Sequence, residues 1–409
     1  MDKSMKFFVV DDDPVILKLV KTLLEAGGHS VTCTNSSDDA VASIQTQSPD
    51  CVLSDIMMPG MDGFELCKKL RDSDALIATK IVMMSVKTYE FDRQRARELG
   101  ADGYLLKPID PETFLDQIRQ ILADQMILQY WGVRGTLPVP GRKTLKYGGN
   151  TPCVTLSLPR ERLFIFDAGT GIKELSNELM RKDDRPVTAR LFLSHPHWDH
   201  IQGLPFFSPL YIPGNEFEIC GASHSDLTVR ELVSGQMGGV YFPITIQKFG
   251  ASVIFHDLHE GSFDFDDIRV ETMLLSHPGN CLGYRVYCQS KSICYVTDNE
   301  LFRPDLPQYS ATYVARLVNF IKRTDILIAD ATYTDEEYPS KVEYGHSCIG
   351  EVVKLAHAAE VKELHLFHHD PDQTDDDIDL KHEVATRMLN SLNSKTRCIA
   401  PAEGDTYEL

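Results

Sequence analysis

Three histidines and an aspartate lie within the segment Ser194–His200, whose sequence is SHPHWDH. His195 and His197 are two residues apart, so at the end of a strand both side chains can point to the same side. Asp199 and His200 follow directly and can face a second point from the start of a helix. Imidazole and carboxylate together suit zinc, manganese or iron. Two such neighbouring sets are what a two-metal hydrolytic centre needs, so the segment predicts one corner of a dinuclear site.

Three further donors follow short apolar runs later in the chain, where strands are expected to end. They are His277, Asp298 and His368. His277 completes three imidazoles with His195 and His197. The second set consists of Asp199, His200 and His368, and Asp298 can bridge the two ions through its two oxygens. Asp167, also at a strand end, is expected to fix the tautomer of a histidine.

A second group of chemically useful residues lies near the N-terminus, again where apolar runs end: Asp11, Asp12, Asp55, Ser85 and Lys107. Three carboxylates together repel one another and favour Mg²⁺, which prefers oxygen ligands. A metal-bound cluster leaves Asp55 as the acceptor of a phosphoryl group. Ser85 can donate a hydrogen bond to the phosphoryl oxygens, and Lys107 can pair with their charge.

The elements that carry this second group alternate regularly between strand and helix. Such alternation predicts a parallel sheet covered on both faces, with ligands beyond the carboxyl ends of the strands. The expected strands are Lys6–Val10, Ser30–Thr34, Cys51–Leu53, Lys80–Met84 and Gly103–Leu106, and the expected helices are Val15–Leu24, Asp38–Ile44, Gly63–Leu70, Arg93–Leu99 and Glu112–Leu122.

The rest of the chain has a different order of elements, which fits two sheets with helices outside, an αββα sandwich. We therefore expect two domains, residues 1–124 and residues 125–409, without a Pro-, Gly- or Ser-rich linker between them. The expected strands are Met126–Trp131, Cys153–Leu158, Leu163–Phe166, Leu191–Leu193, Phe217–Cys220, Ile244–Phe249, Ile268–Leu275, Gly283–Cys288, Ser292–Val296, Ile326–Ala329 and Glu363–Phe367. The expected helices are Ile172–Met180, Ile201–Phe207, Ala311–Lys322, Ile349–Ala358 and Asp375–Leu392.

The composition constrains location and partners. The 409 residues carry a formal net charge of −19, which argues against bulk binding of nucleic acid, whose phosphates need a basic surface. No apolar run approaches the roughly 18 residues of a membrane span. The first residues do not have the pattern of a signal peptide. Ten scattered cysteines without a CxxC motif fit free thiols in a reducing compartment, so we expect a cytoplasmic protein.

The first domain resembles the receiver domain of two-component response regulators. The resemblance rests on VVDDDP, SDIMMPGMDGFELCKKLR, MMS and LLKP, which cover that domain from end to end. It implies that Asp55 is the phosphoacceptor, that Asp11 and Asp12 hold Mg²⁺, and that Ser85 and Lys107 sense phosphorylation. Tyr104 matches the switch aromatic residue of the family. The implied partner is a sensor histidine kinase, and the alternative is a degenerate receiver that only dimerises.

The second domain resembles the metallo-β-lactamase superfamily through FDAGTG, SHPHWDH, LSHPG, YVTDNE and FHHDP, in that order. His369 competes with His368 as a ligand; His368 is preferred because Pro371, three residues later, matches the family's pattern. The segments HPGNCLGYR and YGHS resemble the branch that holds ribonuclease Z and a cyclic-phosphate phosphodiesterase. In that branch an additional histidine, here His346, contacts the scissile phosphate and can protonate the leaving oxygen.

These observations predict a response regulator whose output is a dinuclear phosphodiesterase with two zinc or manganese ions, iron being a further option. The catalytic residues would be His346, Asp199 and Asp298, while Arg134 and Asn150 are candidate phosphate contacts with an equally good structural explanation. The acidic charge disfavours tRNA, so the expected substrate is a small or cyclic nucleotide phosphodiester. The alternatives are an esterase or thioesterase on the same fold and a metal-stabilised signalling module without activity. A homodimer is left open.

Overall fold

The computed structural model describes residues 4–76, 79–86, 92, 95–96, 99–122, 126–159, 162–181, 186–240, 242–266, 268–288 and 291–409. The chain divides into two compact units. One consists of Met1–Gln125 together with Leu158–Arg162, and the other of Met126–Ser157 together with Leu163–Leu409. Each unit is described by itself. No helix in the described part of the chain is long and apolar enough to cross a bilayer.

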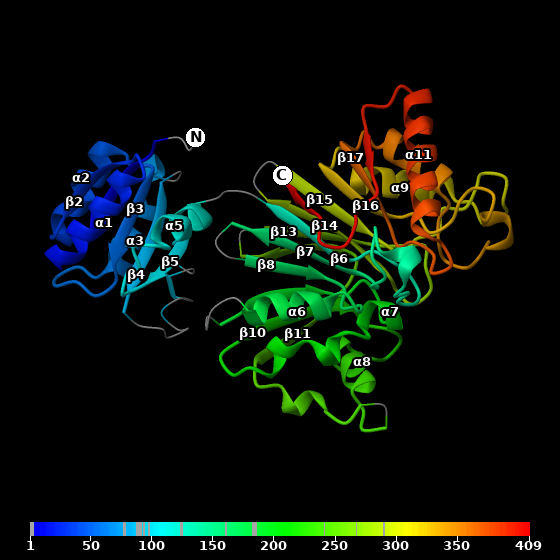
Figure 1. Ribbon diagram of the computed structural model, residues 1–409, viewed down its shortest axis with the longest axis horizontal. Coiled ribbons are helices and arrows are strands. Elements are labelled where there is room, and N and C mark those ends of the chain that lie inside the picture. The colour runs from blue at the N-terminus through cyan, green and yellow to red at the C-terminus, as the bar shows by residue number, and fades with distance from the viewer. Residues whose placement is uncertain are drawn as a thin grey trace. The chain divides into compact units, whose positions relative to one another are not determined.

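The first unit holds a parallel five-stranded sheet in the order β2-β1-β3-β4-β5 (Figure 1). Its strands are β1 (Lys6–Val10), β2 (Ser30–Thr34), β3 (Cys51–Asp55), β4 (Lys80–Ser85) and β5 (Gly103–Leu106), and its helices are α1 (Pro14–Ala26), α2 (Ser37–Gln47), α3 (Gly63–Arg71) and α5 (Phe114–Leu122). The expected alternation is confirmed. The expected helix Arg93–Leu99 lies largely outside the described residues.

Both faces of this sheet are buried. Because successive side chains of a strand point to opposite faces, each strand contributes to two cores. Phe8 and Val10 of β1 pack in one core with α2 and α3. Phe7 and Val9 pack in a second core with α1 and α5. A parallel sheet covered on both sides explains why the strands read as nearly continuous apolar runs.

The second unit contains two seven-stranded sheets, in the orders β11-β10-β9-β8-β7-β6-β19 and β12-β13-β14-β15-β16-β17-β18. The strands of the first are β6 (Ile127–Gly132), β7 (Cys153–Leu158), β8 (Arg162–Phe166), β9 (Thr188–Phe192), β10 (Glu216–Ala222), β11 (Ser252–Leu258) and β19 (Thr406–Glu408). Those of the second are β12 (Gly261–Phe265), β13 (Ile268–Leu274), β14 (Leu282–Cys288), β15 (Lys291–Val296), β16 (Ile326–Asp330), β17 (Glu363–Phe367) and β18 (Arg397–Ile399).

Helices cover the outer faces of the two sheets, which makes the unit the expected αββα sandwich (Figure 1). The helices packed on the first sheet are α6 (Ile172–Arg181) and α8 (Val229–Gln236), and those packed on the second are α9 (Ala311–Ile321), α10 (Ile349–Ala358) and α11 (Asp375–Ser391). Between the sheets lies an aromatic layer in which Phe166 contacts Tyr284 and Tyr295 across the sandwich.

Three local expectations are corrected. The segment Ile244–Phe249 is not a strand; it holds a 3-10 turn at Ile246–Lys248, and the sheet edge is taken by β11. The expected helix Ile201–Phe207 is instead the short α7 (Trp198–Ile201) followed by a 3-10 turn at Leu204–Phe206, because Pro205 has no N–H to continue the helix. Helix α8 was not expected, although Thr228 and Glu231 form a capping box at its start.

Candidate metal centre and phosphoacceptor site

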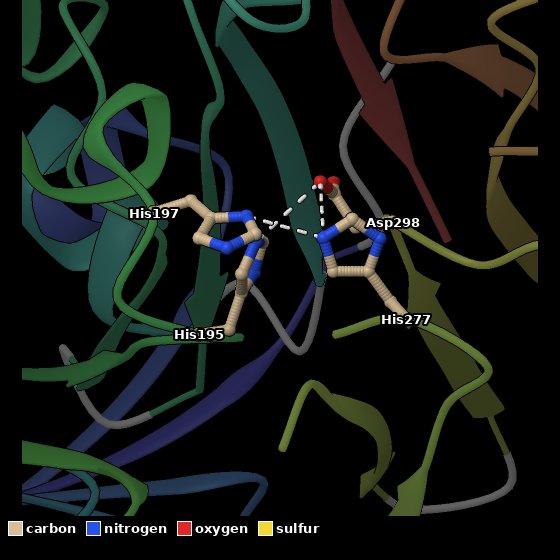
Figure 2. Close-up of side chains that lie close together, drawn as sticks. All are labelled: His195, His197, His277 and Asp298. Atoms are coloured by element: carbon tan, nitrogen blue, oxygen red, sulfur yellow. Dashed lines mark hydrogen bonds and ion pairs between the residues drawn. The ribbon is translucent and has the colours of Figure 1, made fainter. Parts of the chain in front are cut away.

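The structure brings together all seven expected donors of the second unit. They form two groups whose donor atoms lie within 4.8 Å of one another. The first group is His195, His197, His277 and Asp298, drawn in Figure 2, and the second is Asp199, His200, Asp298 and His368. Asp298 belongs to both groups, which is the geometry expected of a bridging carboxylate.

Five of the seven donors lie just beyond the end of a strand, and the other two lie in the short helix that follows β9. His195 and His197 follow β9, and α7 then carries Asp199 and His200. The other donors come from the second sheet, where they follow β13, β15 and β17. The centre therefore lies at one end of the sandwich and takes donors from both sheets. This is where the sequence placed it, because apolar strands that end in His or Asp deliver those side chains to a common edge.

Where the strands end near the donor cluster, three non-glycine residues have a backbone in the left-handed region. Asp167, Asp298 and His368 have φ of 59°, 51° and 59°. Non-glycine residues adopt this conformation rarely, at a cost on the order of 1 kcal/mol or more each. At each position the turn aims a side chain into the cluster immediately after a strand. The fold thus tolerates strained backbone where the donors must converge.

The donor atoms fit divalent metal ions. The two oxygens of Asp298 divide between the groups: Oδ1 lies 3.1 Å from Nε2 of both His200 and His368, and Oδ2 lies 3.5 Å from Nε2 of His195. Nε2 of His195 and Nε2 of His200 are nonetheless buried without a hydrogen-bond partner among the described residues. Buried nitrogens that face carboxylates without hydrogen-bond geometry are suited to share an ion with them.

The protonation of two donors, His195 and Asp298, also suits metal binding. Burial lowers the pKa of His195 well below its ordinary value, so the imidazole is neutral and its lone pair is available. Burial acts to raise the pKa of Asp298, but the neighbouring His200 and His368 outweigh it and hold that pKa well below the ordinary value. The carboxylate is therefore ionised.

Four of the five imidazoles share one arrangement, with Nε2 turned to the cluster and Nδ1 held by a protein oxygen. The partners of Nδ1 are Ser194 Oγ at 3.0 Å for His195, Asp167 Oδ2 at 2.7 Å for His200, the carbonyl of Gly345 at 2.8 Å for His277, and Thr332 Oγ1 at 3.2 Å for His368. Such partners fix the tautomer and the direction of the ring. His197 is the exception, because its Nδ1 lies 3.1 Å from Nε2 of His277.

Asp167 lies at the centre of these supports. Besides His200, it accepts hydrogen bonds from the Tyr295 hydroxyl at 2.8 Å and from Ser194 N and Oγ at 2.7 and 2.8 Å. We predict that Asp167→Asn weakens metal affinity by roughly 10- to 100-fold, since the amide no longer fixes the His200 tautomer. The measurement is competition with a chromophoric chelator.

A matched control is Asp325→Asn. Asp325 directly precedes β16, at the end of that strand away from the donors. Asp325 is also buried and accepts a backbone hydrogen bond, from Ser292 N at 2.8 Å. It should lower the melting temperature without changing metal affinity. Equal metal affinity in both variants and the wild type would show that Asp167 does not tune the site.

His346 lies beside the seven donors. Its ring stacks on His368, with centroids 4.8 Å apart and planes at 21°, and Nδ1 lies 2.9 Å from Asp330 Oδ2. Burial acts to lower the pKa of His346, but the buried Asp330 carboxylate outweighs it and raises the pKa to about 9. The residue can therefore be protonated near neutral pH. Asp330 also accepts from Asn299 N and Thr332 N at 3.0 Å each, so it ties together the loops of Asp298, His346 and His368.

The loop that carries His346 is anchored by one buried carboxylate. Glu300 accepts hydrogen bonds from Gly345 N and Glu343 N at 2.8 Å each and from the Tyr338 hydroxyl at 2.9 Å. Gly345 has φ of +84°, and a Cβ there would lie 2.4 Å from Nδ1 of His277. Only glycine combines that backbone conformation with so close an approach to a donor ring.

Apart from Asp167, sequence reasoning missed the residues that support the donors. Asp330 and Glu300 carry no motif that reveals their roles, although Asp330 ends an apolar strand as the donors do. Thr136 was also missed; its backbone N–H donates to Asp199 Oδ2 at 2.7 Å. No side-chain signal could have revealed that contact, because the main chain makes it.

The expectation that Arg134 and Asn150 contact a phosphate is corrected. Arg134 is fully buried and donates to the carbonyls of Gly148 at 3.0 Å and Gln373 at 2.5 Å. Asn150 donates through N and Nδ2 to the Glu403 carboxylate, at 2.6 and 2.9 Å. Their polar groups are used in holding loops together, which is the structural explanation that the sequence left open.

His369 takes no part in the donor groups. Its backbone N–H donates to the carbonyl of Val133 at 3.1 Å, and its carbonyl accepts from Gly135 N at 2.8 Å. The ring is buried away from the cluster, whereas His368 lies in it. The structure thus favours His368 over His369 as the donor.

In the first unit, Asp11, Asp12 and Asp55 also form a candidate group of donors. Lys107 Nζ lies 2.6 Å from Asp55 Oδ1 and 2.7 Å from Asp11 Oδ2. Burial raises the pKa of Asp55, and the Lys107 ammonium opposes that shift. The remaining expected residues also lie on neighbouring strands: Ser85 is buried at the end of β4, and Tyr104 is buried in β5.

Comparisons with known proteins agree with both units. Residues 7–119 match the response regulator receiver domain, and residues 162–369 match the beta-lactamase superfamily domain. The Pseudomonas aeruginosa protein PilH is 35% identical over 29% of this chain and 98% of its own length. The alkaline phosphatase synthesis transcriptional regulatory protein PhoP of Bacillus subtilis is 36% identical over 29% of this chain, which spans about half, 49%, of PhoP.

Among solved structures, the metallo-beta-lactamase fold protein YhfI from Bacillus subtilis aligns with 70% of this chain and 100% of its own, at 16% identity and a TM-score of 0.51. At that identity the likeness concerns the fold alone. The chain belongs to the beta-lactamase superfamily and carries a response regulator receiver domain ahead of the superfamily domain. The family and the donor set together indicate a metal-dependent hydrolase.

Proposed function

We propose that this protein is a response regulator whose output domain is a dinuclear-metal phosphodiesterase for small or cyclic nucleotide phosphodiesters, controlled by phosphorylation of Asp55. The observation that carries the proposal is the position of His346. It lies outside the seven donors, stacks on one of them and is held by a buried carboxylate. A hydrolase for esters with good leaving groups has little use for such a group, whereas a phosphodiesterase needs an acid for its alkoxide leaving group.

Each residue then has a definite task. The seven donors would hold two divalent ions, which when bound supply Lewis acidity and a nucleophile at neutral pH. Asp199 and Asp298 face the reacting region with ionised oxygens, and the N–H of Thr136 fixes the direction of Asp199. His346 would give its proton to the leaving oxygen. Asp330 both orients that imidazole and keeps it protonated.

Turnover of bis(p-nitrophenyl) phosphate by full-length, metal-loaded protein tests the proposal, with p-nitrophenyl acetate and a thioester as competing substrates. We expect the phosphodiester to be cleaved with the highest kcat/KM. A screen of cyclic mononucleotides and dinucleotides then identifies the natural class. Preferential hydrolysis of the carboxylic ester or thioester would contradict the proposal, and no turnover by protein with two bound ions would favour a non-enzymatic module.

The receiver prediction concerns Asp55. A sensor histidine kinase would supply the phosphoryl group in the cell, and beryllofluoride with Mg²⁺ serves as a stable substitute. We predict that beryllofluoride changes kcat/KM by about fivefold or more, as expected for a coupling free energy of about 1 kcal/mol or more. Asp55→Asn should abolish that change, whereas Asp116→Asn, an exposed position on α5, should leave it intact. Equal turnover with and without beryllofluoride would contradict the proposed control.

A further inference from the structure

His197 differs from the other donor imidazoles in the way it is held. It turns Nδ1 to the cluster, so its Nε2 faces away from it. His197 is exposed, and its Nε2 has no hydrogen-bond partner among the described residues, whereas Nδ1 of each of the other four rings has one. A neutral imidazole that uses Nδ1 as a ligand carries its proton on Nε2. An N–H donor is therefore directed outward from the centre.

A second imidazole without a partner lies near that donor. A Cβ built on Gly279 would lie 3.8 Å from Nε2 of His197 and 4.0 Å from Nδ1 of His224. Gly279 has φ of +92°, so a side chain would be strained there, and the glycine places no side chain of its own between the two rings. Nδ1 of His224 is buried and has no hydrogen-bond partner in the described part of the chain. We call this space the Gly279 notch.

The Gly279 notch is held in place by the loops on either side. His224 follows β10, and its backbone pairs with Leu227. Asn280 Nδ2 donates to the carbonyl of Ser223 at 3.1 Å, which ties the His224 loop to the loop that follows His277. The notch is thus bounded by segments fixed to each other, and the unpaired nitrogens do not result from a free loop end.

We propose that His197 Nε2 and His224 bind an anionic oxygen of the substrate at the Gly279 notch, so that the enzyme selects phosphodiesters bearing a second acidic group. The proposal rests on the proposed phosphodiesterase function. Nε2 of His197 faces away from the donor cluster, where the scissile phosphate would bind. The anionic oxygen at the notch therefore belongs to another part of the substrate. Two imidazole N–H donors match the oxygens of a phosphate monoester or carboxylate.

Two substrates that differ by one phosphate test this. Thymidine 5′-(p-nitrophenyl phosphate) has only the scissile diester, and its 3′-phosphorylated form carries the second acidic group. For full-length, metal-loaded wild type we expect kcat/KM to be about tenfold higher for the 3′-phosphorylated ester, mainly through a lower KM. His224→Ala should remove that preference while changing turnover of the unphosphorylated ester by less than about twofold. His259→Ala, at an exposed histidine of the same unit, is the control.

Binding of thymidine 3′,5′-bisphosphate, measured by calorimetry, gives a readout that does not depend on turnover. We expect His224→Ala to weaken it about tenfold with two ions still bound. A loss of turnover by the same factor for both esters would overturn the proposal, because His224 would then only position His197. Unchanged kinetics and binding would also overturn it. Absence of turnover by the wild type, with bisphosphate binding still sensitive to His224, would instead contradict the phosphodiesterase function.

Discussion

Replacing Asp298 with asparagine is expected to abolish phosphodiester hydrolysis, with a loss of kcat of about 10³-fold or more, because the residue serves both metal positions. Its two oxygens face Nε2 of His200 and His368 on one side and Nε2 of His195 on the other. An amide offers one neutral oxygen in place of two charged ones. We therefore expect elemental analysis to find at most one tightly bound ion per chain, where the wild type holds two.

The control for this prediction is Asp305→Asn, an exposed aspartate of the same unit, which should retain both ions and full turnover. The backbone at Asp298 adopts φ of 51°, and asparagine tolerates that conformation well. Failure to fold is therefore not the expected cause of lost activity, and circular dichroism checks this. Two bound ions and near-normal turnover in Asp298→Asn would show that the carboxylate does not bridge the groups.

His346→Gln is expected to lower kcat by about 10²- to 10⁴-fold for substrates with poor leaving groups, the range usual for loss of a general acid. The effect should be much smaller for p-nitrophenyl esters, whose leaving group departs without a proton. Metal content should stay at two ions, since His346 lies outside the two groups that share Asp298, although it forms a further candidate group with Asp330 and His368. This dependence on the leaving group separates an acid from a residue that only supports His368 through stacking.

The pH dependence gives an independent check. Because Asp330 raises the pKa of His346, the acid form is present at neutral pH, and activity should fall as the pH rises through that pKa. In His346→Gln this alkaline limb should disappear. His357→Ala on α10 is the control and should keep the wild-type profile. An equal loss for good and poor leaving groups, with the alkaline limb retained, would show that His346 is not the acid.

Much of the fold was readable from the sequence because most elements have a strong local signal. Helix α10 (Ile349–Ala358) and β17 (Glu363–Phe367) have the expected bounds. The errors concern mostly short elements: α8, β11, β12, β18 and β19 were not expected. The apolar run Ile244–Phe249 looks like a strand, but strand pairing is decided by partners distant in sequence, and β11 pairs with β10 instead.

The donors and their support Asp167 were predictable for a related reason, and the other supports were not. A histidine or aspartate after a buried strand is visible in the sequence. The pairing of His346 with Asp330 depends on β16 lying between β15 and β17. The role of Arg134 as a buried anchor depends on its hydrogen bond to the carbonyl of Gln373, which is distant in sequence. Such contacts follow from tertiary packing, so the same arginine was compatible with a phosphate contact and with a buried anchor.

The origin of the donors in both sheets has a consequence beyond catalysis. Ions bound there would fasten the two halves of the sandwich to each other at one end. An ion that binds only the folded chain stabilises it by roughly 4 kcal/mol when its free concentration is about a thousand times Kd. Metal supply would then govern how long the protein survives proteolysis as well as how fast it works. In a metal-starved cell the amount of the output domain, and not only its turnover, would fall.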